Sequence, residues 1–313
     1  MSADRLSPST APVSLDRKAV EYQLLARSYV QRLRRSPQLE FLLEDIDEYE
    51  ALMREYDGAE LRSAKVFEIG YGARPYRQLA LQSMGVDVEG VDAEQPVLRG
   101  TPAELRAAWR VNGPERAMKS LLRRVAFDPR ERAAFRRLLQ ARGLTPRLDP
   151  SRLRVSDAAE VELVPGSLDL VFSEEVFQSV EMSSLERIVP AMAAWLRPGG
   201  LALIRPNVFT GITGCLLQEW SRWSVAHPPQ SRRSEPWEHL RDDRFSPNTH
   251  ANRLSRADYR ELFAPHFELL EERVKEPDLG RRYYTPEVAA ALADWPEEEL
   301  FSNCTMFVLR KPA

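Results

Sequence analysis

Short apolar runs alternate with longer amphipathic segments through the middle of the chain. The runs have the length of buried strands, and the segments repeat their apolar residues at helical spacing. This alternation predicts a parallel β-sheet with helices on both of its faces. The predicted strands cover residues 65–69, 86–91, 152–155, 168–172 and 201–205, and the predicted helices cover residues 76–84 and 184–196.

Helical patterns also precede the first strand. One runs from Leu15 to about Arg35, and a second follows Pro37 and ends at Asp57-Gly58, where glycine suits a helix C-cap. We therefore expect a disordered polar tail at residues 1–14, a helical cap at residues 15–58 and a core domain at residues 59–313. The cap helices are expected to pack on the core, and they are also a candidate homodimer surface.

The last part of the chain predicts two more strands, at residues 266–274 and 303–310, with a short helix near residues 285–293. Some sixty residues separate the second and third strands, far more than a simple crossover needs. They contain helical patterns at residues 102–111, 114–127 and 129–139, which predict an inserted helical lid at about residues 97–150.

Composition narrows the class of protein. The formal net charge of −3 gives no electrostatic reason to expect nucleic acid as a partner. No signal peptide or run of 18 apolar residues is visible, so we expect a cytoplasmic protein with no membrane partner. Two cysteines are too few for a disulfide framework or a metal cluster, and we expect no metal. The arginine-rich, lysine-poor composition is typical of a bacterial genome rich in G and C.

Candidate chemistry begins where the first strand ends. Glu68-Ile69-Gly70-Tyr71-Gly72 places two glycines in a tight turn, where a ligand can approach the backbone closely. Asp92 ends the second strand twenty residues later, where nucleotide-binding α/β folds hold a ribose hydroxyl. The pattern predicts an adenosine-containing cofactor. Pro75 stands where the dinucleotide fingerprint has its third glycine, which disfavours a nicotinamide-dependent oxidoreductase.

Three further motifs follow in order. Ser156-Asp157-Ala158-Ala159 follows the third strand, Pro165–Ser173 contains the fourth, and Trp195-Leu196-Arg197-Pro198-Gly199-Gly200 precedes the fifth. Over roughly residues 60–210 this order resembles the class I S-adenosylmethionine-dependent methyltransferases. The resemblance implies a Rossmann-like α/β fold with a seven-stranded mixed sheet that ends in an antiparallel pair.

The resemblance also implies the cofactor, S-adenosyl-L-methionine, and its site. The glycine turn would lie beside the amino-acid part, Asp92 would hold the ribose, and Asp157 would reach the adenine amine. The implied cofactor-binding residues are Glu68, Gly70, Gly72, Asp92, Asp157, Ala158 and Ser173. Asp92 also suits a solvated turn, and Asp157 also suits a helix N-cap.

The base for an acceptor proton is less defined. Many relatives carry a Glu-His pair after the fourth strand, whereas this chain has Gln178-Ser179 there. Glu174 and Glu175 come directly off that strand, and either is a candidate base, a stabiliser of a cationic intermediate, or a helix-capping or solvent-exposed residue. The long loop at residues 225–253 supplies a second set of candidates, His227, His239 and His250, each of which also suits a structural role.

Candidate acceptor-binding residues are spread along the chain. The segment after the fifth strand suggests one wall of a pocket, and a basic stripe on the insertion suits either a phosphate or a solvated face. The candidates are Asn207, Phe209, Trp237, Arg123 and Tyr283.

We therefore expect methyl transfer to a small-molecule acceptor, most often at oxygen, in specialised biosynthesis or glycan modification. Two alternatives stay open. One is transfer to carbon or nitrogen of a phosphate- or diphosphate-bearing acceptor, and the other is a non-catalytic binding or regulatory protein that keeps the fold.

Overall fold

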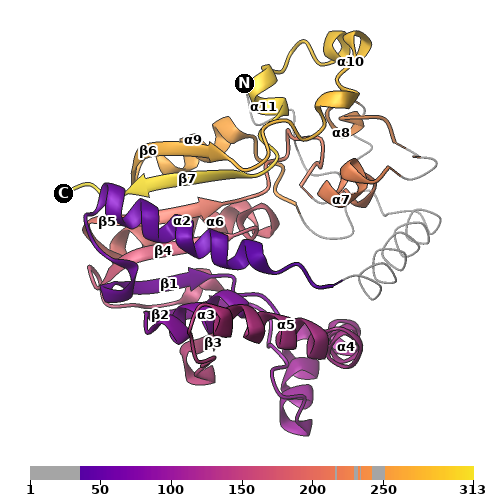
Figure 1. The fold of residues 1–313 in the computed structure, drawn as a ribbon. Coiled ribbons are helices and arrows are strands. Elements are labelled where there is room, and N and C mark those ends of the chain that lie inside the picture. The colour runs from indigo at the N-terminus through magenta and orange to yellow at the C-terminus, as the bar shows by residue number, and fades with distance from the viewer. Residues whose placement is uncertain (1–35, 216, 229–231, 233, 242–250) are drawn as a thin grey trace. The chain divides into compact units, whose positions relative to one another are not determined.

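The computed structural model describes residues 36–215, 217–228, 232, 234–241 and 251–313. The predicted tail, the first predicted helix and His250 lie outside this part of the chain. Seven strands form one sheet in the order β3-β2-β1-β4-β5-β7-β6 (Figure 1). Their bounds are Lys65–Ile69 (β1), Asp87–Asp92 (β2), Leu153–Val155 (β3), Leu168–Glu174 (β4), Leu196–Arg205 (β5), Glu268–Val274 (β6) and Thr305–Arg310 (β7).

Both strand directions occur in this sheet. β1 pairs in parallel with β2 and with β4, and β2 pairs in parallel with β3. β7 runs against β5, because Asn207 bridges Cys304 antiparallel at one end and Lys311 pairs with Gly199 and Gly200 at the other. The predicted seven-stranded mixed sheet with an antiparallel pair is confirmed.

The structure contains most of the helices that the hydrophobic periodicity predicts. The α-helices of the described chain are α2 (Glu40–Tyr56), α3 (Tyr76–Met84), α4 (Pro102–Ala126), α5 (Asp128–Ala141), α6 (Met182–Trp195), α7 (Arg222–Ala226), α8 (Glu238–Arg241), α9 (Arg256–Phe263), α10 (Pro286–Ala291) and α11 (Glu297–Leu300). α4 joins two predicted helices across a kink at Gly113, whose φ of 78° is non-helical. None of the described helices is long and apolar enough to cross a membrane.

The described chain divides into two compact units. The first, here called the cofactor unit, comprises residues 32–173, 190–203 and 310–313. The second, here called the acceptor unit, comprises residues 174–189 and the described residues between 204 and 309. The predicted domain boundaries differ from this division and stay predictions.

In the cofactor unit, α2 lies against the sheet. Its apolar face is buried, and the Tyr49 ring lies 5.0 Å from the Phe172 ring of β4. Arg197 donates to Asp57, which follows α2, and to Asp169 of β4, whose other oxygen accepts the Lys65 backbone N–H. This arginine therefore connects the end of α2 to the starts of β1 and β4.

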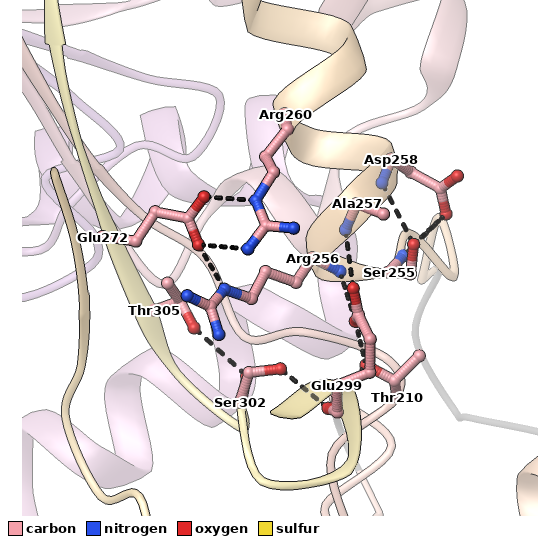
Figure 2. Close-up of polar contacts among 10 residues, drawn as sticks. All are labelled: Thr210, Ser255, Arg256, Ala257, Asp258, Arg260, Glu272, Glu299, Ser302 and Thr305. Atoms are coloured by element: carbon pink, nitrogen blue, oxygen red, sulfur yellow. Dashed lines mark hydrogen bonds and ion pairs between the residues drawn. The ribbon is translucent and has the colours of Figure 1, made fainter. Parts of the chain in front are cut away.

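In the acceptor unit, the buried Glu299 carboxylate connects three segments (Figure 2). It accepts the backbone N–H groups of Arg256 and Ala257 at 3.0 and 2.9 Å, and the Thr210 hydroxyl at 3.1 Å. The two N–H groups belong to the first turn of α9, where no intrahelical acceptor exists. Glu299 thereby caps α9 and holds the segment that follows β5.

We expect Glu299→Ala to lower the free energy of unfolding by about 3 kcal/mol, because buried donors at the α9 N-terminus and at Thr210 lose a charged acceptor. Urea unfolding followed by far-UV circular dichroism measures the change. Glu298→Ala is the matched control, since Glu298 is an exposed neighbour on α11 and should change stability by less than about 0.5 kcal/mol. Equal stability of the two variants would contradict the capping role.

Candidate functional site

The glycine turn is held open by backbone geometry. Gly70 and Gly72 have φ values of 84° and 68°, in the left-handed region that glycine adopts without strain. A Cβ atom at Gly72 would meet no atom within 4 Å, so the space beside this backbone is open. The Gly70 N–H donates to Val91 O at 2.7 Å, which ties the turn to the end of β2.

Asp92 closes the same turn from the neighbouring strand. One carboxylate oxygen accepts the Gly72 N–H and the other accepts the Glu94 N–H, both at 2.8 Å. Burial raises the pKa of Asp92 above its usual value, although these two N–H groups oppose the rise. Each oxygen keeps a lone pair, and the residue is only partly buried, so the carboxylate can accept a hydroxyl donor as well.

Glu68 lies under the turn. The Gln78 side-chain amide donates to the buried Glu68 carboxylate at 2.9 Å and to Glu89 O at 3.2 Å. A Cβ at Gly90 would lie 2.8 Å from the Gln78 amide nitrogen and 3.1 Å from Glu68 O, so a larger residue there would displace the Gln78 side chain. Glu68 therefore supports the floor of the turn.

Tyr71, which lies between the two glycines, makes a contact that the sequence did not predict. Its hydroxyl donates to Arg154 O of β3 at 2.8 Å, and its pKa is raised by burial and by Asp92 and Glu68. The aromatic residue in the Gly-x-Gly motif was the only available signal. Tyr71 fixes the turn to the third strand.

The remaining predicted cofactor residues occupy adjacent strand ends. Ser173 is buried and its hydroxyl donates to Ile69 O at 2.8 Å. Asp157 is exposed and caps a short 3-10 helix, Ala158–Glu160, by accepting the Ala159 N–H at 2.9 Å. The Ser156 N–H donates to Asp92 O at 3.0 Å, which brings the Asp157 loop beside Asp92.

These residues suit an adenosine cofactor with an amino-acid part. The turn offers accessible glycine backbone, and two carboxylates on adjacent loops can accept from hydroxyl and amine donors. Their roles toward the cofactor stay predictions.

In the acceptor unit, Glu174 and Glu175 have different surroundings. The Glu174 carboxylate forms an ion pair with Arg205 at 3.2 Å, and the two side chains are 3% and 2% exposed. The Glu175 side chain is 50% exposed, and its carboxylate lies 3.7 Å from the Arg222 guanidinium. Arg205 and Arg222 were absent from the predicted site, since nothing in the sequence pairs them with these glutamates.

Gln178, the first residue of the Gln178-Ser179 pair, connects the loops around Glu175. Its side-chain amide donates to Glu175 O at 2.6 Å, and its carbonyl oxygen accepts the Asn207 N–H at 3.2 Å. Asn252 donates its backbone N–H to Gln178 O at 2.9 Å. Gln178 is therefore a positioning residue for both Glu175 and Asn207.

The candidate histidines have different environments. His227 is exposed and stacks on Trp223 with ring centroids 4.8 Å apart. His239 is buried, and its Nε2 lies 2.9 Å from Phe209 O. Burial lowers the pKa of His239 to about 4, so the ring is neutral at pH 7 and holds the backbone after β5. His250 lies outside the described residues.

The candidate acceptor-binding residues also differ in burial and in the unit to which they belong. Phe209 and Trp237 are fully buried, and the Trp237 indole donates to Leu300 O at 3.3 Å. Asn207 is partly exposed, and Tyr283 accepts from Arg282 at 2.8 Å. Arg123 belongs to the cofactor unit, where it donates to Ser120 at 3.4 Å. Phe209 and Trp237 thus contribute packing, which leaves Asn207 as the accessible member after β5.

Two members of the basic stripe of the insertion form ion pairs with glutamates. Arg116 pairs with Glu94 and Lys119 pairs with Glu115. In the described chain, no group of three or more His, Cys, Asp or Glu side chains is arranged to hold a metal ion.

The lowered pKa of His239 predicts a pH effect on stability. Between its unfolded pKa of about 6.5 and its folded pKa of about 4, only the unfolded chain binds the proton, so stability falls as pH falls through this window. His239→Gln, which keeps a donor toward Phe209 O, should lose about 3 kcal/mol less than the wild type between pH 7 and pH 4. Urea unfolding across this pH range measures the difference, and parallel acid limbs would contradict the assignment.

Part of the chain is similar to a known protein family. Residues 112–204 match the family model described as a methyltransferase domain. This segment runs from the second half of α4 to β5, and it therefore begins after the glycine turn and Asp92. No curated protein matches the sequence.

Several solved structures are similar to the chain. The PH0226 protein from Pyrococcus horikoshii is 14% identical, with a TM-score of 0.44, and the match covers 89% of this chain and 93% of that one. A SAM-dependent methyltransferase from Methanosarcina mazei is 15% identical, with a TM-score of 0.44 and coverage of 83% and 97%. Phosphoethanolamine N-methyltransferase 2 from Haemonchus contortus is 16% identical, with a TM-score of 0.43 and coverage of 85% and 53%.

Residues 112–204 are therefore similar to methyltransferase domains, and the same chain carries a seven-stranded mixed sheet with an open glycine turn that Asp92 closes.

Proposed function

We propose that this enzyme methylates a hydroxyl group of a small-molecule acceptor, with Glu175 as the general base. The observation that carries the proposal is the half-exposed Glu175 carboxylate immediately after β4. Ligands of open α/β sheets bind at the carboxyl ends of the strands, which is where this residue lies. An alcohol must lose its proton during methyl transfer, and a carboxylate within hydrogen-bond reach can take it.

The residues of the cofactor unit support the cofactor end of this proposal. S-adenosylmethionine supplies an electrophilic methyl group on a sulfonium. The backbone at Gly70 and Gly72 would lie against its amino-acid part, Asp92 would accept from the ribose, and Asp157 would accept from the adenine amine. Ser173 lies next to the turn, because its hydroxyl bonds to the last residue of β1.

The backbone conformation of Glu175 supports its role. Glu175 follows β4 directly, at the carboxyl end of that strand. Glu175 also has a φ of 56°, a conformation that costs of order 1 kcal/mol or more in a non-glycine residue. Its N–H donates to Arg205 O at 2.8 Å, and Gln178 bonds its carbonyl, so the surrounding structure maintains the strained backbone.

Glu174 is the less suitable base. Its carboxylate is buried against Arg205, and taking up a proton there would break a buried ion pair and leave the guanidinium charge without its counter-ion. We assign Glu174 to holding Arg205, whose carbonyl in turn accepts from Glu175.

The small size of the acceptor is supported by the near-neutral net charge, which provides no broad basic surface for a nucleic acid. A role in specialised biosynthesis or glycan modification is part of this proposal. So is a homodimer through the N-terminal helices.

We expect Asp92→Ala to weaken binding of S-adenosylmethionine and S-adenosylhomocysteine at least tenfold, because the ribose loses a charged acceptor. Isothermal titration calorimetry measures both affinities. Asp87→Ala is the matched control, since Asp87 is an exposed aspartate at the opposite end of β2. Affinity that survives in Asp92→Ala would place the cofactor elsewhere.

We expect Glu175→Gln to lower kcat about 100-fold at unchanged cofactor affinity and melting temperature, since amide cannot accept the proton. The acceptor for this test comes from screening hydroxyl-bearing small molecules for formation of S-adenosylhomocysteine. Glu174→Gln is the contrasting variant, and it should lower the melting temperature because it removes the carboxylate that neutralises buried Arg205. Carbon-13 NMR of the product locates the methyl group, and a methyl on carbon or nitrogen would overturn the proposed acceptor atom.

A further inference from the structure

A cavity of about 310 Å³ opens in the cofactor unit, between the start of α3, the loop after β2, α5 and the loop before β3. Four arginines line it, Arg74, Arg99, Arg132 and Arg136, and no carboxylate does. Its volume is at the lower end of the range for small-molecule sites. None of the residues predicted to bind the cofactor lines this cavity.

Carboxylates outside the lining neutralise part of this charge. Arg74 pairs with Asp128 at 3.0 Å and with Glu131. Arg132 lies 4.0 Å from the same Asp128, and its guanidinium donates to the backbone carbonyls of the loop after β2. Arg74 and Arg132 therefore form ion pairs with two acidic side chains, Asp128 and Glu131.

Arg99 and Arg136 have no such partner. Both side chains are exposed, and neither guanidinium forms an ion pair with any residue in the described part of the chain. Burial lowers the pKa of Arg132, and the charges of Arg124 and Arg136 lower it further, whereas Asp128 and Tyr76 raise it. Arg132 and Arg136 therefore repel one another electrostatically. An anion in the cavity would relieve this repulsion.

The rest of the wall is apolar. Leu79, Leu98 and Leu148 line the cavity together with three prolines. Tyr76 also lines it, and its buried hydroxyl oxygen has no hydrogen-bond partner among the described residues. A ligand that matches this wall has a charged end and an apolar body.

We propose that this cavity binds an organic phosphate monoester. Its phosphate lies against Arg99, Arg132 and Arg136, because planar guanidinium groups match phosphate oxygens with paired hydrogen bonds. Its apolar body lies along the leucines and prolines. This site is distinct from the basic stripe on α4, where Arg116 and Lys119 are paired with glutamates, and it does not depend on the identity of the methyl acceptor.

The test is calorimetric titration of the full chain with phenyl phosphate and with inorganic phosphate, at 0.15 M salt to screen diffuse surface charge. Arg99→Ala/Arg136→Ala removes the two unpaired cavity arginines. Arg106→Ala/Arg137→Ala is the matched control, since it removes two exposed arginines of α4 and α5 that do not line the cavity. If the cavity variant unfolds, the single variants Arg99→Ala and Arg136→Ala replace it.

We expect phenyl phosphate to bind the wild type and the control within twofold of each other, and the cavity variant at least tenfold more weakly. Phenyl phosphate should also bind more tightly than inorganic phosphate, because the apolar wall contacts the ring. Absence of binding to the wild type, or equal weakening in both double variants, would overturn the proposal. Displacement of phenyl phosphate by S-adenosylmethionine, together with its loss in Asp92→Ala, would place the anion in the cofactor site and overturn it as well.

Discussion

The cofactor unit depends on one carboxylate that joins two strand ends. Asp92 accepts backbone N–H groups from Gly72 in the turn after β1 and from Glu94 after β2. The turn has left-handed glycines, and the Gly70 N–H and the Tyr71 hydroxyl tie it to β2 and β3 as well. Burial disfavours the charge of Asp92, and the two N–H groups compensate in part. The carboxylate that is expected to contact the ribose is therefore already oriented by the backbone it shares with the glycine turn.

In the acceptor unit, one glutamate has a structural role and its neighbour is the proposed base. Glu174 and Glu175 are adjacent and chemically identical, yet one is buried against Arg205 and the other is half exposed near Arg222. The strained backbone at Glu175 turns its side chain away from that of its neighbour. Gln178 fixes the resulting loop through hydrogen bonds on both sides. Gln178 thus orders the loop, and a carboxylate remains as the proposed base.

The positions of the basic residues along the sequence of the insertion do not show which of them are paired with acids and which line a cavity. The stripe of basic residues on α4 faces glutamates, whereas the arginines of the cavity come from three different segments. Each of these arginines is unremarkable in the sequence. Their convergence next to apolar side chains places several guanidinium groups at one cavity, which is the chemistry that the proposed phosphate ligand requires.

The sequence by itself predicted the elements that depend on local patterns, namely hydrophobic periodicity and the placement of glycines. β1 and α3 have the predicted bounds, and the glycine turn lies between them. β5 begins five residues before its predicted start, because Gly199 and Gly200 in the apparent turn pair with Lys311, more than 100 positions away. Tertiary structure alone decided which glutamate is buried, where His239 lies and which arginines meet. Burial and ion pairing depend on partners brought together by folding, and no local pattern encodes them.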